Sequence, residues 1–287
     1  MEIIVLTTGS EEKSAKKLGY PTYTYLPYDK KNHDELVVIR WGNGFVSAPI
    51  ANPIFDEQDD FKYVLNPQKS IELNVTKNKS FEILSATVPM PKIYNLKIPS
   101  RKTAVYRPTQ HAGGSDFKLQ KGPFVIEPNH YATEFIRTDK EIRVFVCGNK
   151  SLTCSREKGK KSDSDICRSN YAYRKFRKTP KRLHGLAIRA AKALKLDICA
   201  FDILVKGRKY YFLEGNSAPT IEGEVRQFFQ AGIKTLIKRK FPKIGKISKP
   251  QKPVNKPFGA VNSVNLSIKN DNKTNIGKLA LPSWAAI

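Results

Sequence analysis

Residues 200–219, AFDILVKGRKYYFLEGNSAP, contain two apolar runs joined by Lys-Gly-Arg-Lys. This pattern predicts a β-hairpin with a glycine in its turn. Asp202 interrupts the first run, while Glu214 and Asn216 end the second. Carboxylates are costly inside apolar strands unless a cation compensates them. We therefore expect Asp202 and Glu214 to point to one face of the hairpin, with Asn216 just beyond them.

Two carboxylates and an amide are hard oxygen ligands, the kind that Mg²⁺ prefers when it also holds nucleotide phosphates. Asp202, Glu214 and Asn216 are therefore candidate metal ligands. A hairpin with one satisfied polar residue and a loop acid would give the same pattern. The rest of the chain has to decide between these two interpretations.

The spacing from Asp202 to Glu-Gly-Asn-Ser-Ala-Pro at 214–219 resembles the metal-binding end of ATP-grasp ligases. It is most similar to the glutamate ligases that modify a ribosomal protein, whose final strand reads Glu-Val-Asn-Ser-Ser-Pro. The resemblance implies an α+β (α/β) ATP-grasp fold, in which a small N-terminal α/β lobe precedes two antiparallel-sheet lobes that enclose ATP. It also implies ATP and Mg²⁺ as cofactors, with Mn²⁺ as a substitute metal.

The chain of 287 residues carries 51 Lys and Arg against 26 Asp and Glu, a formal net charge of +25. Such a charge favours polyanionic partners: a nucleoside triphosphate, nucleic acid or an acidic protein. No apolar run is long enough to span a membrane, and the N-terminus lacks the features of a signal peptide. The four cysteines have no CxxC spacing. We therefore expect a cytoplasmic protein with reduced thiols and no membrane partner.

Strands at 1–8 and 36–41, with a helix at 11–18 between them, predict a small parallel sheet at the N-terminus. Further on, Lys79 lies near the start of a helix. This order resembles the family, in which a lysine at such a helix start contacts the ATP phosphates. Lys77 is the competing assignment, and a solvated helix lysine is the alternative to both.

A strand at 103–107 runs into a loop that contains Gly113 and Gly114, whose backbone N–H groups could fold over phosphate oxygens. By resemblance, Arg107 takes the place of a family lysine that touches the phosphates. Arginine keeps the charge and adds a bidentate fork. His111 in the same loop is a candidate phosphate or substrate contact, although a loop histidine without a role would look the same.

Glu134, Phe135 and Ile136 resemble a Glu-Tyr-Ile hinge of the family. In the family, the backbone of this hinge pairs with the adenine edge. The next strand, 141–148, places Arg143 on the same face as Phe145, which is costly unless an anion meets the guanidinium. The resemblance gives Arg143 the role of stabilising the transferring phosphoryl group and the acyl phosphate. A solvated arginine on a surface strand is the alternative.

A third match follows the charged loop at 157–165. Arg168-Ser169-Asn170 resembles an Arg-Ser-Asn triplet of the same ligases. The resemblance implies that Arg168 and Asn170 reach the phosphates or the acyl intermediate. Cations and aromatic residues then alternate through 171–182, a pattern that can bind nucleic acid through phosphate contacts and stacking. A basic lid around ATP and an acidic substrate is the other interpretation of this cluster.

The sequence thus predicts four parts: an N-terminal α/β lobe at 1–75, a central lobe at 76–136, a C-terminal lobe with the metal site at 137–241, and a basic Pro/Lys/Asn-rich tail at 242–287. The implied reaction uses ATP to convert a carboxylate to an acyl phosphate, from which an amine displaces phosphate.

The basic charge favours an acidic amino acid, peptide or protein terminus as the carboxylate, with a small molecule, peptide or protein as the amine. Two alternatives remain: a nucleic-acid-binding protein without ligase activity on the same scaffold, and an ATP-grasp kinase that phosphorylates an alcohol.

Overall fold

The computed structural model describes residues 1–7, 11–24, 36–42, 61–109, 117–138, 140–158 and 171–247. Contacts divide the chain into a compact unit, Met1–Pro253, and a second unit, Val254–Ile287. The lobe boundaries at 75, 136 and 241 stay predictions. None of the helices in these ranges has the length and apolarity that a membrane span requires. Five predicted site residues lie outside the described ranges: His111, Gly113, Gly114, Arg168 and Asn170.

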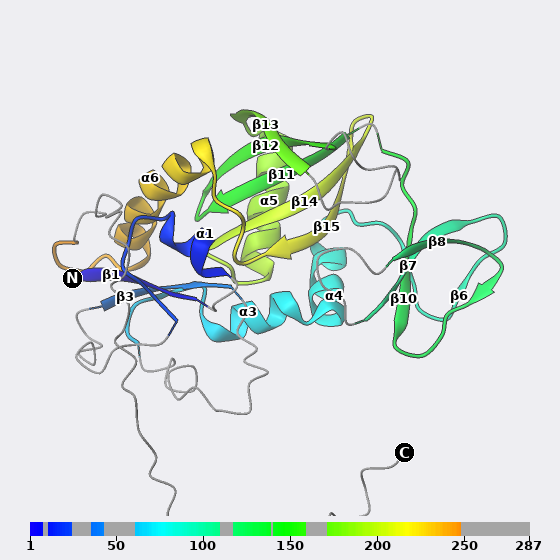
Figure 1. Cartoon of the computed structure of the whole chain (residues 1–287), viewed down its shortest axis with the longest axis horizontal. Coiled ribbons are helices and arrows are strands. Elements are labelled where there is room, and N and C mark those ends of the chain that lie inside the picture. Colours follow the sequence, from blue (N-terminus) through cyan, green and yellow to red (C-terminus); the bar gives the residue numbers. More distant parts are fainter. Residues whose placement is uncertain are drawn as a thin grey trace, which may run out of the picture. The chain divides into compact units, whose positions relative to one another are not determined.

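The chain begins with a parallel sheet of four strands in the order β2-β1-β3-β4 (Figure 1). Its strands are β1 (Glu2–Thr7), β2 (Thr22–Tyr23), β3 (Leu36–Trp41) and β4 (Val64–Leu65). Every residue of β3 is buried, as is typical of parallel strands covered on both faces. A short helix, α1 (Glu12–Lys16), follows β1. The predicted strand, helix and strand are confirmed, and α3 (Gln68–Val75) and α4 (Lys77–Thr87) come next.

A small antiparallel sheet follows, in the order β5-β10-β7-β8. Its strands are β5 (Ile93–Tyr94), β7 (Thr103–Pro108), β8 (Lys118–Lys121) and β10 (His130–Glu134), and beside them β6 (Lys97–Ile98) pairs with β9 (Phe124–Val125). We call these elements the small lobe. Its buried cluster draws on the small lobe alone: Tyr94, Ile98, Ala104, Tyr106, Ile126 and Ala132.

The largest sheet is antiparallel and has five strands in the order β13-β12-β11-β14-β15. Its strands are β11 (Lys140–Cys147), β12 (Lys150–Lys158), β13 (Tyr171–Lys178), β14 (Ile198–Lys206) and β15 (Lys209–Asn216). The predicted hairpin is β14–β15, and its turn places Gly207 at φ +55°, a left-handed conformation that favours glycine.

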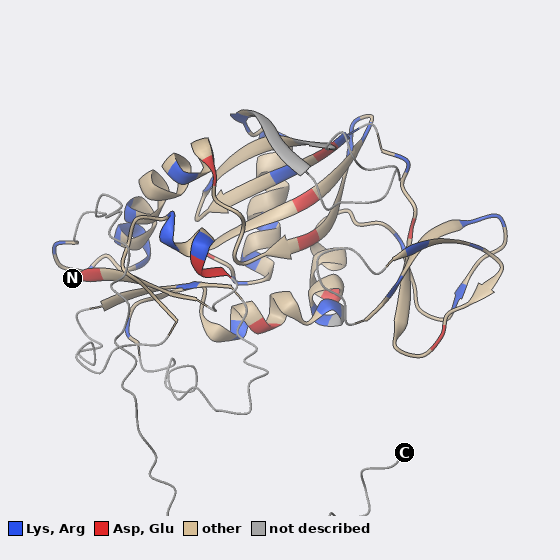
Figure 2. Ribbon diagram, in the orientation of Figure 1, with Lys and Arg blue, Asp and Glu red and all other residues tan. Residues whose placement is uncertain are grey.

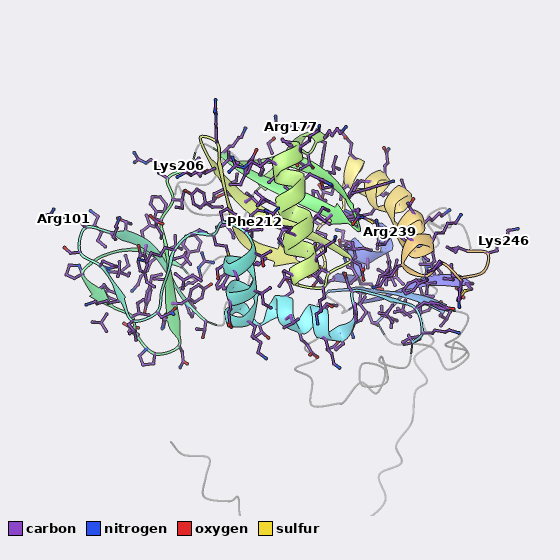
Figure 3. All side chains as sticks on the ribbon, turned by 180° about the vertical axis from the view of Figure 1, so that it is seen from behind. Arg101, Arg177, Lys206, Phe212, Arg239 and Lys246 are labelled. Atoms are coloured by element: carbon purple, nitrogen blue, oxygen red, sulfur yellow. The ribbon has the colours of Figure 1, made fainter. Side chains whose placement is uncertain are left out.

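Two helices cover opposite faces of this sheet. On one face α5 (Lys181–Ala193) packs its apolar side against Val144 and its neighbours, and Figure 3 shows this helix across the sheet, with Phe212 on the strand beneath. On the other face α6 (Gly223–Lys240) and the N-terminal sheet share one core with Phe145 and Ile198. The N-terminal sheet and the large sheet are therefore parts of one hydrophobic body.

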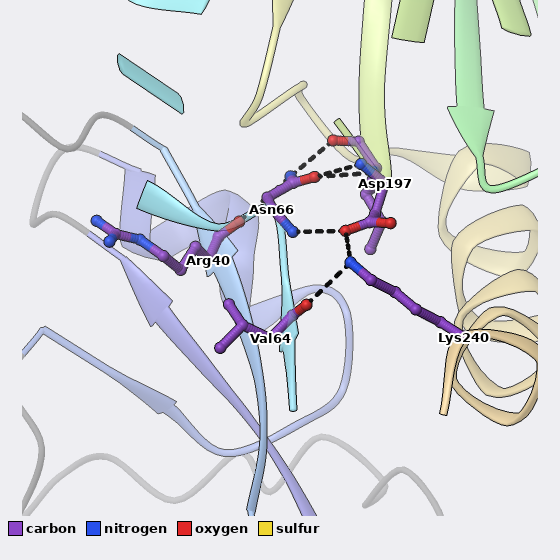
Figure 4. Close-up of polar contacts among 6 residues, drawn as sticks. Arg40, Val64, Asn66, Asp197 and Lys240 are labelled. Carbon is purple, nitrogen blue, oxygen red and sulfur yellow. Dashed lines mark hydrogen bonds and ion pairs between the residues drawn. The ribbon is translucent and has the colours of Figure 1, made fainter. Parts of the chain in front are cut away.

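A polar clamp joins the same two sheets (Figure 4). Asn66, in a left-handed conformation at φ +55°, follows β4. Its side-chain oxygen accepts from the backbone N–H groups of Asp197, at 2.8 Å, and Ile198, at 2.9 Å, and its amide donates to the Ile198 carbonyl at 2.7 Å. Lys240 donates to the carboxylate of Asp197 and to the Val64 carbonyl. One buried side chain thus fixes the start of β14 against the end of β4.

We predict that Asn66→Gly lowers the free energy of unfolding by about 2–4 kcal/mol, because two buried N–H groups and a carbonyl lose their partner. Glycine keeps the left-handed backbone, so the loss reports the hydrogen bonds and not φ strain. Urea unfolding would measure it. Gln68→Ala, which removes a local contact with Glu72 on α3, is the control and should cost below 1 kcal/mol. Equal effects of both changes would contradict the clamp.

Among the residues that the structure describes, Cys147, Cys154 and Cys199 are buried and form no disulfide with one another. Burial raises the pKa of Cys147 to about 12 and that of Cys199 well above its ordinary value. The thiols of Cys147 and Cys199 therefore stay protonated near neutral pH and are not placed to act as nucleophiles.

Candidate active site

The large sheet carries a row of charged side chains across three neighbouring strands. Its register pairs Arg143 of β11 with Asp202 of β14, and Asp202 with Glu214 of β15. Figure 2 shows the basic position on β11 beside the acidic positions on β14 and β15. Directly opposed residues in antiparallel strands share a face. Asn216 lies two residues beyond Glu214 and opposite Ala200, so the predicted common face of the three polar residues is confirmed.

A β-bulge creates this arrangement. From the turn to Ile203, which pairs with Phe212, the hairpin has a regular register that would place Leu213 opposite Asp202. The register shifts at this point and Glu214 takes that place instead. Bulges commonly re-aim side chains next to active sites. The extra residue is therefore the local reason that two carboxylates stand side by side.

Arg143 and Asp202 form a buried bidentate pair. Nε of the arginine donates to Oδ1 at 2.6 Å, and Nη2 donates to Oδ2 at 2.7 Å. The two residues are 8% and 4% exposed. The anion that we expected beside the Arg143 guanidinium is therefore the Asp202 carboxylate of the protein itself. Because each charge is desolvated, each depends on the other.

Lys77, at the start of α4, reaches the end of the row. Its ammonium lies 3.1 Å from the Glu214 carboxylate. Asn74 of α3 donates to the Gly215 carbonyl at 3.1 Å, which holds the α3–α4 corner against β15. Lys79 is exposed. Of the two lysines left open by the sequence, the structure brings Lys77 to the predicted metal ligands.

From the small lobe, Arg107 of β7 is the predicted phosphate contact. Its guanidinium carbon lies 5.7 Å from the ring centre of Tyr131 and 5.8 Å from that of Phe117. Burial raises the pKa of Tyr131 to about 12, Arg107 opposes this, and the Glu214 carboxylate adds to it. Within the described residues the buried Nε of Arg107 has no acceptor. A buried donor of this kind suits an anionic ligand.

The predicted adenine hinge ends β10. The backbone N–H of Glu134 donates to Lys92 at 2.7 Å, and that of Phe135 donates to Thr103 at 3.0 Å. These donors serve the small lobe itself, so an adenine contact would fall to the carbonyls and to the backbone of Ile136, whose side chain is buried. The hinge assignment stays a prediction.

The residues present fit a magnesium ion. The described residues contain no cluster of three or more His, Cys, Asp or Glu side chains. Mg²⁺, however, is usually held by one or two carboxylates together with water and substrate phosphates. The carboxylates of Asp202 and Glu214 and the side-chain oxygen of Asn216 would supply that donor set, and the register places all three on one face of the hairpin.

The profile of a known family, described as the RimK-like ATP-grasp domain, matches residues 128–238. This span contains the whole charged row from Arg143 to Glu214, together with Asn216. The chain carries a RimK-like ATP-grasp domain. The resemblance on which the sequence was interpreted is thereby confirmed, although identity to known members is low.

Among its relatives is a probable alpha-L-glutamate ligase of Vibrio vulnificus, 32% identical over 102 residues, which are 34% of this chain and 33% of that protein. The chain therefore matches about a third of this relative's length. A second probable alpha-L-glutamate ligase, from Maridesulfovibrio salexigens, is 30% identical over 126 residues. These residues are 42% of this chain and 40% of that protein.

Solved structures support the fold of the ATP-grasp domain and its flanking lobes. The ATP-grasp ligase PsnB, complexed with minimal precursor, Mg and ADP, superposes with a TM-score of 0.57 at 15% identity, over 82% of this chain and 97% of PsnB. These similarities, together with the antiparallel sheets, confirm the α+β ATP-grasp fold.

Proposed function

We propose that the protein is an ATP-dependent carboxylate–amine ligase that forms an amide through an acyl phosphate and releases ADP and phosphate. The observation that supports this most is the row Arg143–Asp202–Glu214–Lys77, in which alternating charges from three strands and a helix meet at one place. Phosphoryl transfer needs positioning and charge stabilisation more than covalent chemistry. A row of this kind provides both.

In this proposal Asp202, Glu214 and Asn216 hold Mg²⁺, which supplies neutralisation of the nucleotide phosphates when bound. Lys77 and Arg107 contact the phosphates, and Arg143 stabilises the charge that develops on the transferring group. The hinge of Glu134, Phe135 and Ile136 holds adenine. His111, Gly113, Gly114, Arg168 and Asn170 keep their predicted roles as phosphate and intermediate contacts.

The substrates we propose are an acidic amino acid, peptide or protein terminus and an amine. The net charge of +25 supports an acidic partner. The names of the relatives, probable alpha-L-glutamate ligases, support an amino acid on one side of the reaction. The complex of PsnB with a precursor supports a peptide on the other.

The test is ADP release from MgATP across pools of amino acids and acidic peptides, with hydroxylamine as a surrogate amine. Stimulation by a carboxylate, with a hydroxamate as product, supports the ligase. Stimulation by an alcohol without a hydroxamate would instead identify a kinase. No ADP release with any pool, from protein that binds ATP, would contradict the proposal.

Replacing Lys77 by alanine is expected to raise the KM for ATP about tenfold or more, because one charge-assisted phosphate contact is lost. Lys79→Ala is the matched control, two residues away on the same helix but exposed, and its KM should be unchanged. Steady-state kinetics at saturating carboxylate would measure both. A larger effect from Lys79 would return the phosphate contact to that residue.

A further inference from the structure

A cavity of about 250 Å³ adjoins the charged row. Glu11, Gly42 and Ala218 lie close together in its lining, since a Cβ placed on Gly42 would lie 3.0 Å from the Glu11 side chain and 3.6 Å from Ala218. Lys77 of α4 and Asn216 of β15 also line it. An engineered cavity of about 150 Å³ holds benzene, whereas drug-sized ligands need about 300 Å³ or more. The space therefore suits a ligand of amino-acid size.

Glu11 contributes a carboxylate to this cavity, and no cation among the described residues is paired with it. It is partly buried, burial raises its pKa, and among the described residues no side chain or backbone group donates to it. The segment that follows it is docked on the rest of the protein: Ser14 of α1 donates to the Pro219 carbonyl at 3.0 Å, and Gln230 of α6 donates to the Leu18 carbonyl at 3.0 Å. A partly buried carboxylate is costly unless a cation meets it.

The place of Glu11 in the fold is one where ligands bind. Glu11 follows the carboxyl end of β1, and Gly42 follows the carboxyl end of β3, its neighbour in the parallel sheet. In open parallel sheets ligands bind outside these strand ends. Gly42 has φ +105° and no side chain, so the backbone leaves room for Glu11 beside it.

The same lining also offers a positive charge and a hydrogen-bond donor. Lys77 lies there beside Glu214, and Nδ2 of Asn216 is buried without a partner in the described part of the chain. A ligand that satisfies Glu11 as well as Lys77 has an ammonium toward the first and a carboxylate toward the second. This is the charge pattern of an amino acid.

We infer that this cavity binds the carboxylate substrate, and that this substrate carries a free ammonium group held by Glu11. An ammonium paired with a carboxylate keeps its proton and has no lone pair with which to attack. The group at Glu11 is therefore an anchor, and the reacting group is the carboxylate that faces Lys77. The inference rests on the proposed ligase activity and assigns one of its two substrates.

The test measures hydroxamate formation from L-glutamate, L-aspartate and L-alanine against glutarate, succinate and propionate, the same acids without the amino group. Wild-type protein should prefer the amino acids about tenfold to a hundredfold in kcat/KM, the value of a charge-assisted contact. Glu11→Gln should remove that preference. Glu12→Gln is the matched control, because Glu12 is the next residue and is paired at the surface with Lys16.

Equal use of the two sets of acids by wild-type protein would overturn the inference while leaving the ligase intact. Loss of coupling to amino-acid acceptors in Glu11→Gln, with hydroxamate formation unchanged, would place the amine substrate here instead. Thermal shifts without ATP give a readout that does not need turnover. Stabilisation by the amino acids but not by their deamino analogues, lost in Glu11→Gln, supports the inference, and its absence in wild-type protein contradicts it.

Discussion

Glu214→Gln is expected to lower ADP production about 10²- to 10³-fold, because a carboxylate proposed to hold Mg²⁺ at the nucleotide phosphates loses its charge while the shape is kept. Glu214 is the suitable member of the row for this test. Its side chain is 34% exposed and its partner Lys77 is 22% exposed, so neither charge is left buried when the pair is broken. The measurement is kcat/KM at saturating Mg²⁺, together with the urea midpoint.

Glu224→Gln, an exposed change in the first turn of α6, is the control and should leave both quantities unchanged. A Glu214→Gln variant with normal ADP release and a normal midpoint would exclude this carboxylate from the reaction. A variant with a lowered midpoint would instead show that the residue matters for folding.

Asp202→Ala is expected to lower the free energy of unfolding by about 3–5 kcal/mol, because it leaves the Arg143 guanidinium buried without its partner. Because the pair is buried, this variant cannot separate an effect on activity from an effect on folding. Urea unfolding followed by circular dichroism would measure the loss.

The double variant Arg143→Met with Asp202→Leu separates the two effects. Replacing a buried ion pair by apolar side chains of similar size is often neutral or stabilising. We expect the double variant to recover most of the stability and none of the activity. Recovery of activity together with stability would show that the pair supports the sheet alone, whereas a double variant as unstable as Asp202→Ala would contradict the energetics of the pair.

Much of the site could be predicted because its residues break local patterns. Asp202 stands out in an apolar strand, and Arg143 alternates with buried aliphatic residues, so the strand period alone places both on defined faces. The hairpin followed from a glycine turn between two apolar runs. Family resemblance then gave these residues a common purpose that their spacing could not give.

The remainder depends on contacts between distant parts of the chain. Nothing local to Leu213 indicates the bulge that turns Glu214 toward Asp202. Asn66 meets Ile198 across 132 positions, and no feature near either residue predicts the meeting. Which of Lys77 and Lys79 lies near Glu214 depends on the direction in which α4 leaves its corner. At that corner Asn74 donates to Gly215 of β15, which is likewise a tertiary contact.

The separate core of the small lobe has a consequence for the proposed reaction. The N-terminal sheet and the large sheet, clamped at Asn66 and joined by a common core, keep Asp202 and Glu214 in a fixed position relative to the cavity. The small lobe is joined to them near Pro89 and Thr138, where single hydrogen bonds to Phe212 and Val205 mark the crossings. For the proposed ligase we therefore expect the nucleotide to be released by a movement of the small lobe, while the substrate stays bound to the two joined sheets.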